Sequence, residues 1–141
     1  MYIENVIAKG QLVKLEFEQA AVADSQSAVA MYTDEVAGAV LLTTEYPIPF
    51  AFDVIGITVV TDNPRTAGTL TVDATINGTV TGLQAALDAT NTTRHSKKQP
   101  RGSDRGNEGD RVGVKLTTAS WTPVAADIKV IVWVVVDLEG I

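Results

Sequence analysis

Residues 94–111 form a short segment in which side chains that could do chemistry are concentrated. The segment contains six of the eleven Lys and Arg residues and the only histidine, His95. A Ser-His-Asp triad or a histidine-containing metal site would have to use this one imidazole. Because His95 stands alone among cations in a turn-rich stretch, we interpret it as a solvated loop side chain. The sequence therefore predicts no nucleophilic catalysis here.

Two groups of carboxylates could act as a general acid and base or bind a cation. Asp34 and Glu35 are adjacent, and Glu108 and Asp110 close the stretch SDRGNEGD. A glycosidase needs an apolar pocket that raises the pKa of one carboxyl, whereas both groups lie among polar and glycine residues. An EF-hand also fails, because no bidentate Glu stands at its twelfth position. We predict a protein that is not an enzyme and binds no metal or cofactor.

The same segment is basic within an acidic chain. It carries six Lys and Arg against three Asp and Glu, while the remainder carries five against fourteen, and the formal net charge is −6. No aromatic residue is interleaved with the cations for base stacking, so we predict no nucleic-acid partner. A cationic segment on an acidic body favours contact with another copy of the chain or with another protein.

The elements that must hold these side chains are strands. Nineteen Val and seventeen Thr give a composition that suits a pleated sheet. Asn77-Gly78 favours a two-residue hairpin turn, and Gly56 predicts a kink or close packing within its strand. Alternation of apolar and polar residues marks the candidate strands 11–19, 27–33, 38–46, 53–62, 69–76, 79–87, 110–118 and 127–137. We predict an all-β chain of about eight strands, an antiparallel β-sandwich of the jelly-roll kind.

Residues 10–141 are predicted to form a single domain, with residues 1–9 as an N-terminal arm. A long charged loop is predicted at about 94–109, so we expect deletion of residues 96–106 to leave folding intact. No basic flank precedes a long apolar run near the N-terminus, so we expect no signal peptide. The apolar run 130–136 is too short to cross a membrane, and we predict no membrane partner.

The last predicted strand is apolar on both faces. One face carries Ile128, Val130, Val132, Val134 and Val136, and the other carries Ile131, Trp133 and Val135. A strand with one face in water normally alternates with polar residues, so we expect both faces to be covered. The cover is either another segment of the same chain or a neighbouring subunit. The second alternative predicts a homo-oligomer, which we take to be a trimer.

The order of motifs over residues 46–137 resembles a β-sandwich module of tailed-bacteriophage virion proteins. The matching stretches are YPIPFAF before DVIGI, then AGTLTV, the NG turn with TGLQAALD, GDRVGVKLTT and WTP. Such modules occur in capsid decoration (cement) proteins, head fibres and tail or baseplate fibres. The resemblance implies no catalytic residues, and the cationic stretch 94–108 departs from it.

Two functions are consistent with this resemblance. The first is a capsid decoration protein, made in the host cytoplasm, that oligomerises on the capsid surface of the virion, contacts the major capsid protein and stabilises the head. The second is a module of a phage fibre or baseplate that binds a host receptor or surface glycan, a role that usually accompanies a longer shaft. The residues predicted at the subunit or capsid interface are Tyr2, Ile3, Val6, Ile7, Arg94, Lys97, Lys98, Arg101, Ile131, Trp133 and Val135.

Overall fold

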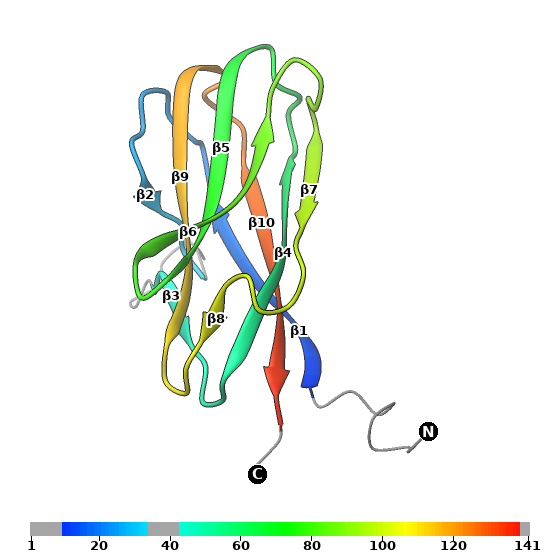
Figure 1. The fold of residues 1–141 in the computed structure, drawn as a ribbon. Coiled ribbons are helices and arrows are strands. Elements are labelled where there is room, and N and C mark those ends of the chain that lie inside the picture. Colours follow the sequence, from blue (N-terminus) through cyan, green and yellow to red (C-terminus); the bar gives the residue numbers. More distant parts are fainter. Residues whose placement is uncertain (1–9, 34–42, 139–141) are drawn as a thin grey trace.

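The computed structural model describes residues 10–33 and 43–138, which form two antiparallel sheets packed face to face (Figure 1). Sheet A has the order β1 (Gly10–Gln19), β10 (Ile128–Asp137), β4 (Phe52–Thr61) and β7 (Arg94–Lys98), and β8 (Arg105–Gly106) also pairs with β4. Sheet B has the order β2 (Val29–Ala30), β9 (Arg111–Thr122), β5 (Ala67–Ile76) and β6 (Thr79–Leu87), and β3 (Glu45–Pro47) also pairs with β9. The predicted all-β sandwich is confirmed.

The last strand that the structure describes lies inside sheet A rather than at its edge. β10 pairs with β1 on one side and with β4 on the other, both antiparallel. Gly10 lies opposite Asp137, so β1 begins where β10 ends, at one end of the sandwich (Figure 1). β10 therefore joins β1 to β4 and the strands that pair with β4.

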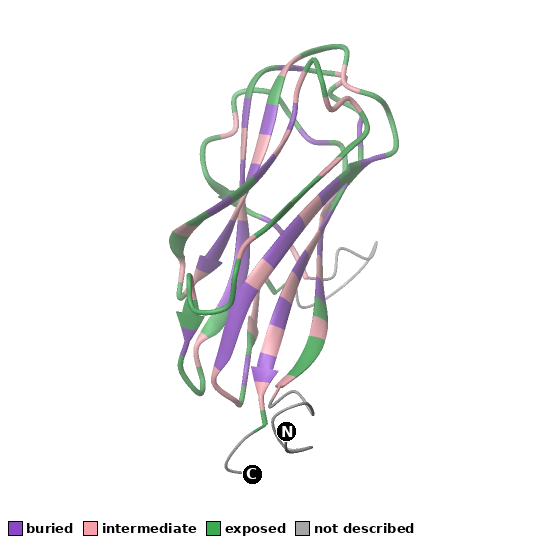
Figure 2. Cartoon of the chain, turned by 45° about the vertical axis from the view of Figure 1, so that its right-hand side comes forward, coloured by how far each residue is buried: buried purple, intermediate pink, exposed green. Residues whose placement is uncertain are grey.

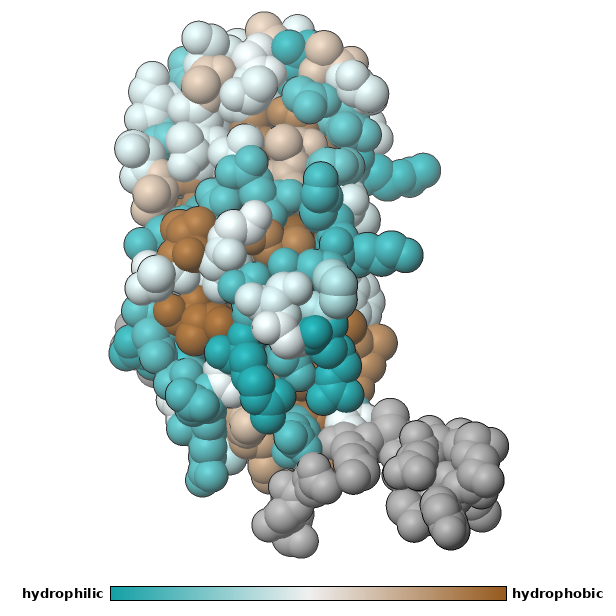
Figure 3. All heavy atoms as spheres, viewed as in Figure 1, coloured by the Kyte–Doolittle hydropathy of each residue, from teal (hydrophilic) through white to brown (hydrophobic). Residues whose placement is uncertain are grey.

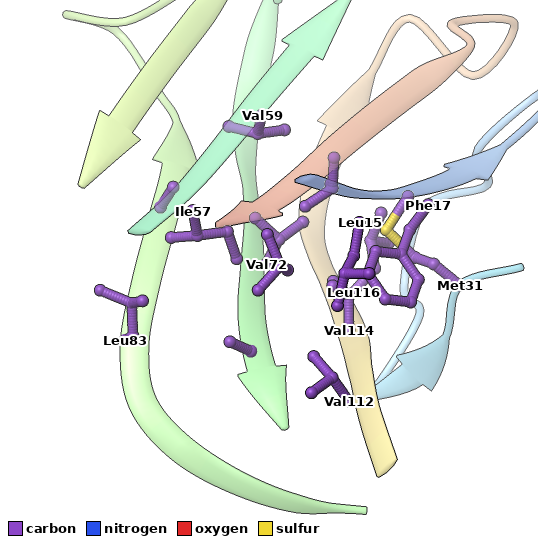
Figure 4. Packing of buried hydrophobic residues seen from close by; sticks show 14 of the residues in the cluster. Leu15, Phe17, Met31, Ile57, Val59, Val72, Leu83, Val112, Val114 and Leu116 are labelled. Atoms are coloured by element: carbon purple, nitrogen blue, oxygen red, sulfur yellow. The ribbon is translucent and has the colours of Figure 1, made fainter. Parts of the chain in front are cut away.

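The core lies between the two sheets and is built from the predicted apolar alternation. Buried and less buried residues alternate along the strands (Figure 2). Leu15 and Phe17 of sheet A point toward Leu116 of sheet B (Figure 4), and all three are at most 6% exposed. Burial of one such side chain stabilises the fold by roughly 1.5–3 kcal/mol. The predicted inner face of β10 is buried as well, and so is Trp121.

The Asn-Gly hairpin between β5 and β6 is confirmed. Asn77 and Gly78 have φ values of 53° and 81°, the two positive values that a type I′ turn requires. The Asn77 side chain also holds the start of β9, because its Oδ1 accepts the Arg111 N–H and its Nδ2 donates to Asp110. The hydrogen bond from Asn77 Nδ2, together with one from the Asn107 N–H, lowers the pKa of the Asp110 carboxyl.

Gly56 lies at a β-bulge where Trp133 crosses β4. Trp133 pairs with Gly56 and Val134 pairs with Val54, so Ile55 is an extra residue in β4. A Cβ on Gly56 would lie 3.2 Å from Cδ1 of Trp133. The close packing predicted at Gly56 is confirmed, and its cause is the indole that lies beside the bare backbone.

The prediction of a loop over 94–109 is wrong at two places. β7 pairs with β4 from Gly56 opposite Lys98 to Val60 opposite Arg94, and β8 pairs with Phe52 and Asp53. Between them, the Gln99 N–H donates to the Ile55 carbonyl. Both strands form because the backbone N–H and C=O groups along this edge of β4 need hydrogen-bond partners. A strand can supply these partners without having an apolar face of its own. These are the two strands by which the structure exceeds the predicted eight.

We predict that Gly106→Ala destabilises the protein. Gly106 is buried, and a Cβ there would clash with the ring of Phe52, a fully buried core residue. Overpacking of this kind lowers the free energy of unfolding by about 1–3 kcal/mol, which urea denaturation would measure. The exposed Ser103→Ala in the same segment serves as a control and should change stability by less than about 0.5 kcal/mol. Equal stability of the two variants would contradict the assigned packing.

Candidate functional site

The outer face of sheet A carries a row of partly exposed apolar side chains. Ile131, Trp133 and Val135 of β10 are half-buried there, and Leu12 of β1, opposite Val135, is 56% exposed. We call Leu12, Ile131, Trp133 and Val135 the outer row. Sheet B covers the inner face of β10, whereas within the described residues the outer row stays partly in contact with solvent. The expected cover of this second face is therefore not supplied in full by the part of the chain that the structure describes.

A groove of about 600 Å³ crosses this face from β1 to β7. Its lining comes from four neighbouring strands: Leu12, Ile55, Gly56, Thr58, Ser96, Lys97, Lys98 and Trp133. We call it the Trp133 groove. Trp133 Nε1 donates to Thr58 Oγ1 at 3.3 Å, and Thr58 Oγ1 bonds Ser96 Oγ at 2.9 Å. The indole is thereby fixed across β4 instead of turning outward.

β7 forms one side of the groove and carries three cations: Lys98 and Arg94 are on the same face of the sheet as the groove, whereas the Lys97 side chain is on the opposite face. Arg94, Lys97 and Lys98 are exposed, and none of them forms an ion pair with another described residue. On the opposite side, Lys14 and Lys129 share Glu16 at 3.3 and 3.4 Å and lower the pKa of that carboxyl. The positive charge next to the groove is thus concentrated on β7 and left without a carboxylate from the described chain.

A buried carboxylate holds the turn that follows β7. Asp53 is 2% exposed, and its Oδ2 accepts hydrogen bonds from Arg101 Nε and Arg105 Nη1, each at 3.1 Å. Its Oδ1 accepts the Gly102 N–H at 3.0 Å. Arg105 also reaches Asp137 at 3.1 Å. We call Asp53, Arg101, Gly102 and Arg105 the Asp53 cluster.

This cluster changes how residues 94–109 are interpreted. Arg101, predicted at an interface, is an ion-pair partner of Asp53 within the same chain. Deletion of residues 96–106 would remove both arginines and part of β7, which argues against the expectation that it leaves folding intact. We expect this deletion to unfold sheet A, because the buried carboxylate of Asp53 would lose both of its cationic partners.

His95 is also held within the fold. Its Nδ1 accepts the backbone N–H of Ala86 at 3.1 Å. Ala86 belongs to β6 of sheet B, so the imidazole joins the two sheets at one side of the sandwich. The interpretation of His95 as a solvated loop side chain is therefore wrong, because a neighbouring strand supplies a donor that the sequence could not reveal.

The structure brings some of the predicted interface residues together. Trp133, Lys97 and Lys98 line one groove, and Arg94 lies on the same strand as the two lysines. The predicted residues Tyr2, Ile3, Val6 and Ile7 lie outside the described residues. Sequence reasoning missed Leu12, although alternation in QLVKLEF already placed it on the face of Lys14. It also missed Asp53, because an acid at the start of an apolar run is typical of a strand boundary.

Across residues 10–33 and 43–138, no three His, Asp or Glu side chains gather as potential ligands of one metal ion. The described residues also include no helix with the length and apolar character needed to cross a membrane.

No protein-family model and no curated protein matches the chain. Among solved structures, it is similar to a chain of the Cyanophage Pam1 capsid asymmetric unit, with 14% sequence identity and a TM-score of 0.49. The similarity covers 90% of this chain and 86% of that chain.

We predict that Asp53→Asn loosens the turn between β7 and β8. The substitution removes the charge that two arginines and one N–H hold, and unsatisfied buried polar groups of this kind cost about 1–3 kcal/mol. Urea denaturation would measure the loss. Glu108→Gln removes one negative charge from an exposed position of the same segment, so it serves as the control. A loss of stability as large in Glu108→Gln would show that net charge, not the Asp53 cluster, is responsible.

Proposed function

We propose that this chain is a structural protein of a tailed-phage virion, namely a capsid decoration protein that oligomerises and stabilises the head shell. The order of motifs over residues 46–137 supports the phage virion class. The observation that carries the decoration role is the outer row, an apolar strip on the exterior of an acidic protein. Removing such a strip from water contributes about 25 cal/mol for each Å² of apolar surface, before the entropic cost of association is subtracted.

A repeating shell suits a surface of this modest size. Each copy needs only a weak contact with the major capsid protein if it is also joined to other copies, because linked contacts act at a high effective concentration. We propose a homo-oligomer, a trimer, as the unit that attaches. We also propose that the chain has no catalytic role and uses no cofactor.

The row of apolar residues predicts self-association. We expect the protein to be oligomeric by size-exclusion chromatography with light scattering, and Leu12→Asp to shift it toward the monomer, because a carboxylate would have to be buried in the contact. Val124→Asp is a matched control, since Val124 is 55% exposed and Leu12 is 56% exposed, and Val124 lies outside the outer row. If the unsubstituted protein is entirely monomeric by light scattering at micromolar concentration, the proposal is contradicted.

Binding to assembled heads is the direct test of decoration. We expect the protein to sediment with empty phage heads and to raise the temperature at which they disrupt, because a ligand that binds only the intact shell stabilises it. Leu12→Asp should bind less and protect less than Val124→Asp. Sedimentation with tails and never with heads would contradict the decoration role.

One observation favours the alternative of a receptor-binding module. The indole of Trp133 lies beside the hydroxyls of Thr58 and Ser96, and an aromatic plane next to hydroxyls can receive a sugar ring. Tail-only sedimentation together with binding to a glycan array would support this alternative over decoration.

A further inference from the structure

Two features of β4 shape the Trp133 groove. The bulge at Ile55 and the missing side chain at Gly56 allow the indole to lie across the strand. The neighbouring positions are Leu12 on one side and Lys98, opposite Gly56 in the register, on the other. An apolar side chain inserted from outside would thus contact Leu12, Ile55 and the indole, and lie within reach of a lysine.

The charge at the edge of the groove differs from charge elsewhere on the chain. Every other cation among the described residues forms an ion pair with a carboxylate or donates to a backbone carbonyl: Lys14, Arg65, Arg101, Arg105, Arg111, Lys115 and Lys129. Arg94, Lys97 and Lys98 on β7 form no such bond with the described part of the chain. Lysines on an edge strand also discourage pairing with another edge, but that role does not require an apolar groove beside them.

We propose that the Trp133 groove receives an extended, acidic segment of a partner polypeptide, with one apolar side chain on the indole and a carboxylate at Lys98. The inference rests on the proposed function and specifies the chemistry of the protein surface that this chain contacts. Opposite charges across such an interface steer the encounter and select the partner, while the apolar side chain in the groove supplies most of the affinity.

The lining favours a polypeptide over a saccharide. Three of the side chains that form it are apolar: Leu12, Ile55 and Trp133. The two hydroxyls in the groove already bond each other at 2.9 Å, and the lining contains no Asn, Gln, Asp or Glu that would hold the hydroxyls of a sugar ring. The outer row continues past the groove along β10, which suits successive side chains of a polypeptide. A two-fold contact with a second copy of this chain is disfavoured at the groove itself, because it would bring the cationic β7 strands of the two copies together.

A direct test uses short fluorescein-labelled peptides and the full chain. An alternating Glu-Leu peptide should bind saturably by fluorescence polarisation, and binding should weaken as salt rises, because exposed charges are screened. Alternating Lys-Leu and Glu-Ser peptides should not bind, since each lacks one half of the required chemistry. Hyaluronate, an anionic saccharide, should not displace the Glu-Leu peptide. No binding of the Glu-Leu peptide, or equal binding of all three peptides, would overturn the proposal.

Matched variants place the peptide in the groove. Lys98→Glu and Trp133→Ala should each weaken binding of the Glu-Leu peptide about tenfold or more, as substitutions of charged and aromatic anchors do. Arg111→Glu reverses one exposed charge on sheet B and should leave binding unchanged. Trp133→Phe keeps an aromatic ring and should retain part of the binding if Trp133→Ala fails to fold. An equal loss in Arg111→Glu would show that only net charge is sensed and would overturn the proposal.

Sedimentation with heads separates this inference from the proposed function. If Lys98→Glu loses peptide binding and head binding together, both are supported. If Lys98→Glu binds heads normally while Leu12→Asp does not, decoration stands and the acidic partner segment is overturned. Displacement of the peptide by hyaluronate would assign the groove to an anionic saccharide instead and would overturn the acidic partner segment.

Discussion

The carboxylate of Asp53 has to be neutralised where it lies, because it belongs to a central strand and is 2% exposed. A buried charge without a partner would destabilise the fold by several kcal/mol. Two arginines and a backbone N–H from residues 101–105 supply the partners, so the chain must return along the edge of β4 to place them. β7 and β8 flank that turn. The cationic side of the Trp133 groove therefore depends on a carboxylate that does not line it.

Much of the sandwich could be predicted because its strands are covered on one side only. In β1, Leu15 and Phe17 face the core while Lys14 and Glu16 face outward, and this alternation is visible in the letters themselves. The Asn77-Gly78 hairpin could also be predicted from the sequence, since few residue pairs adopt two positive φ values at low cost. Gly56 marked close packing within a strand, although only the structure shows that the indole of Trp133 is what lies there.

The cationic segment could not be predicted from its letters for a physical reason. In β7 the side chains are mostly exposed on both faces, so no hydrophobic period distinguishes it from a loop. Its strand conformation comes from hydrogen bonds to β4, a partner more than thirty residues away in the sequence. The hydrogen bond from the Ala86 N–H to His95 and the ion pairs of Arg101 and Arg105 are likewise tertiary. The groove escaped prediction for the same reason, because it exists only when four strands are side by side.

The position of β10 has a consequence for how the protein is made. Of the strands that the structure describes, β10 is synthesised last, and it must enter between β1 and β4. Until it arrives, the core face of β1, with Leu15 and Phe17, has no hydrogen-bonded neighbour in sheet A to hold it against sheet B. Closing a loop of more than a hundred residues is slow in comparison with local pairing. Until β10 is synthesised, a nascent chain therefore exposes apolar side chains and unpaired strand edges, which favour aggregation.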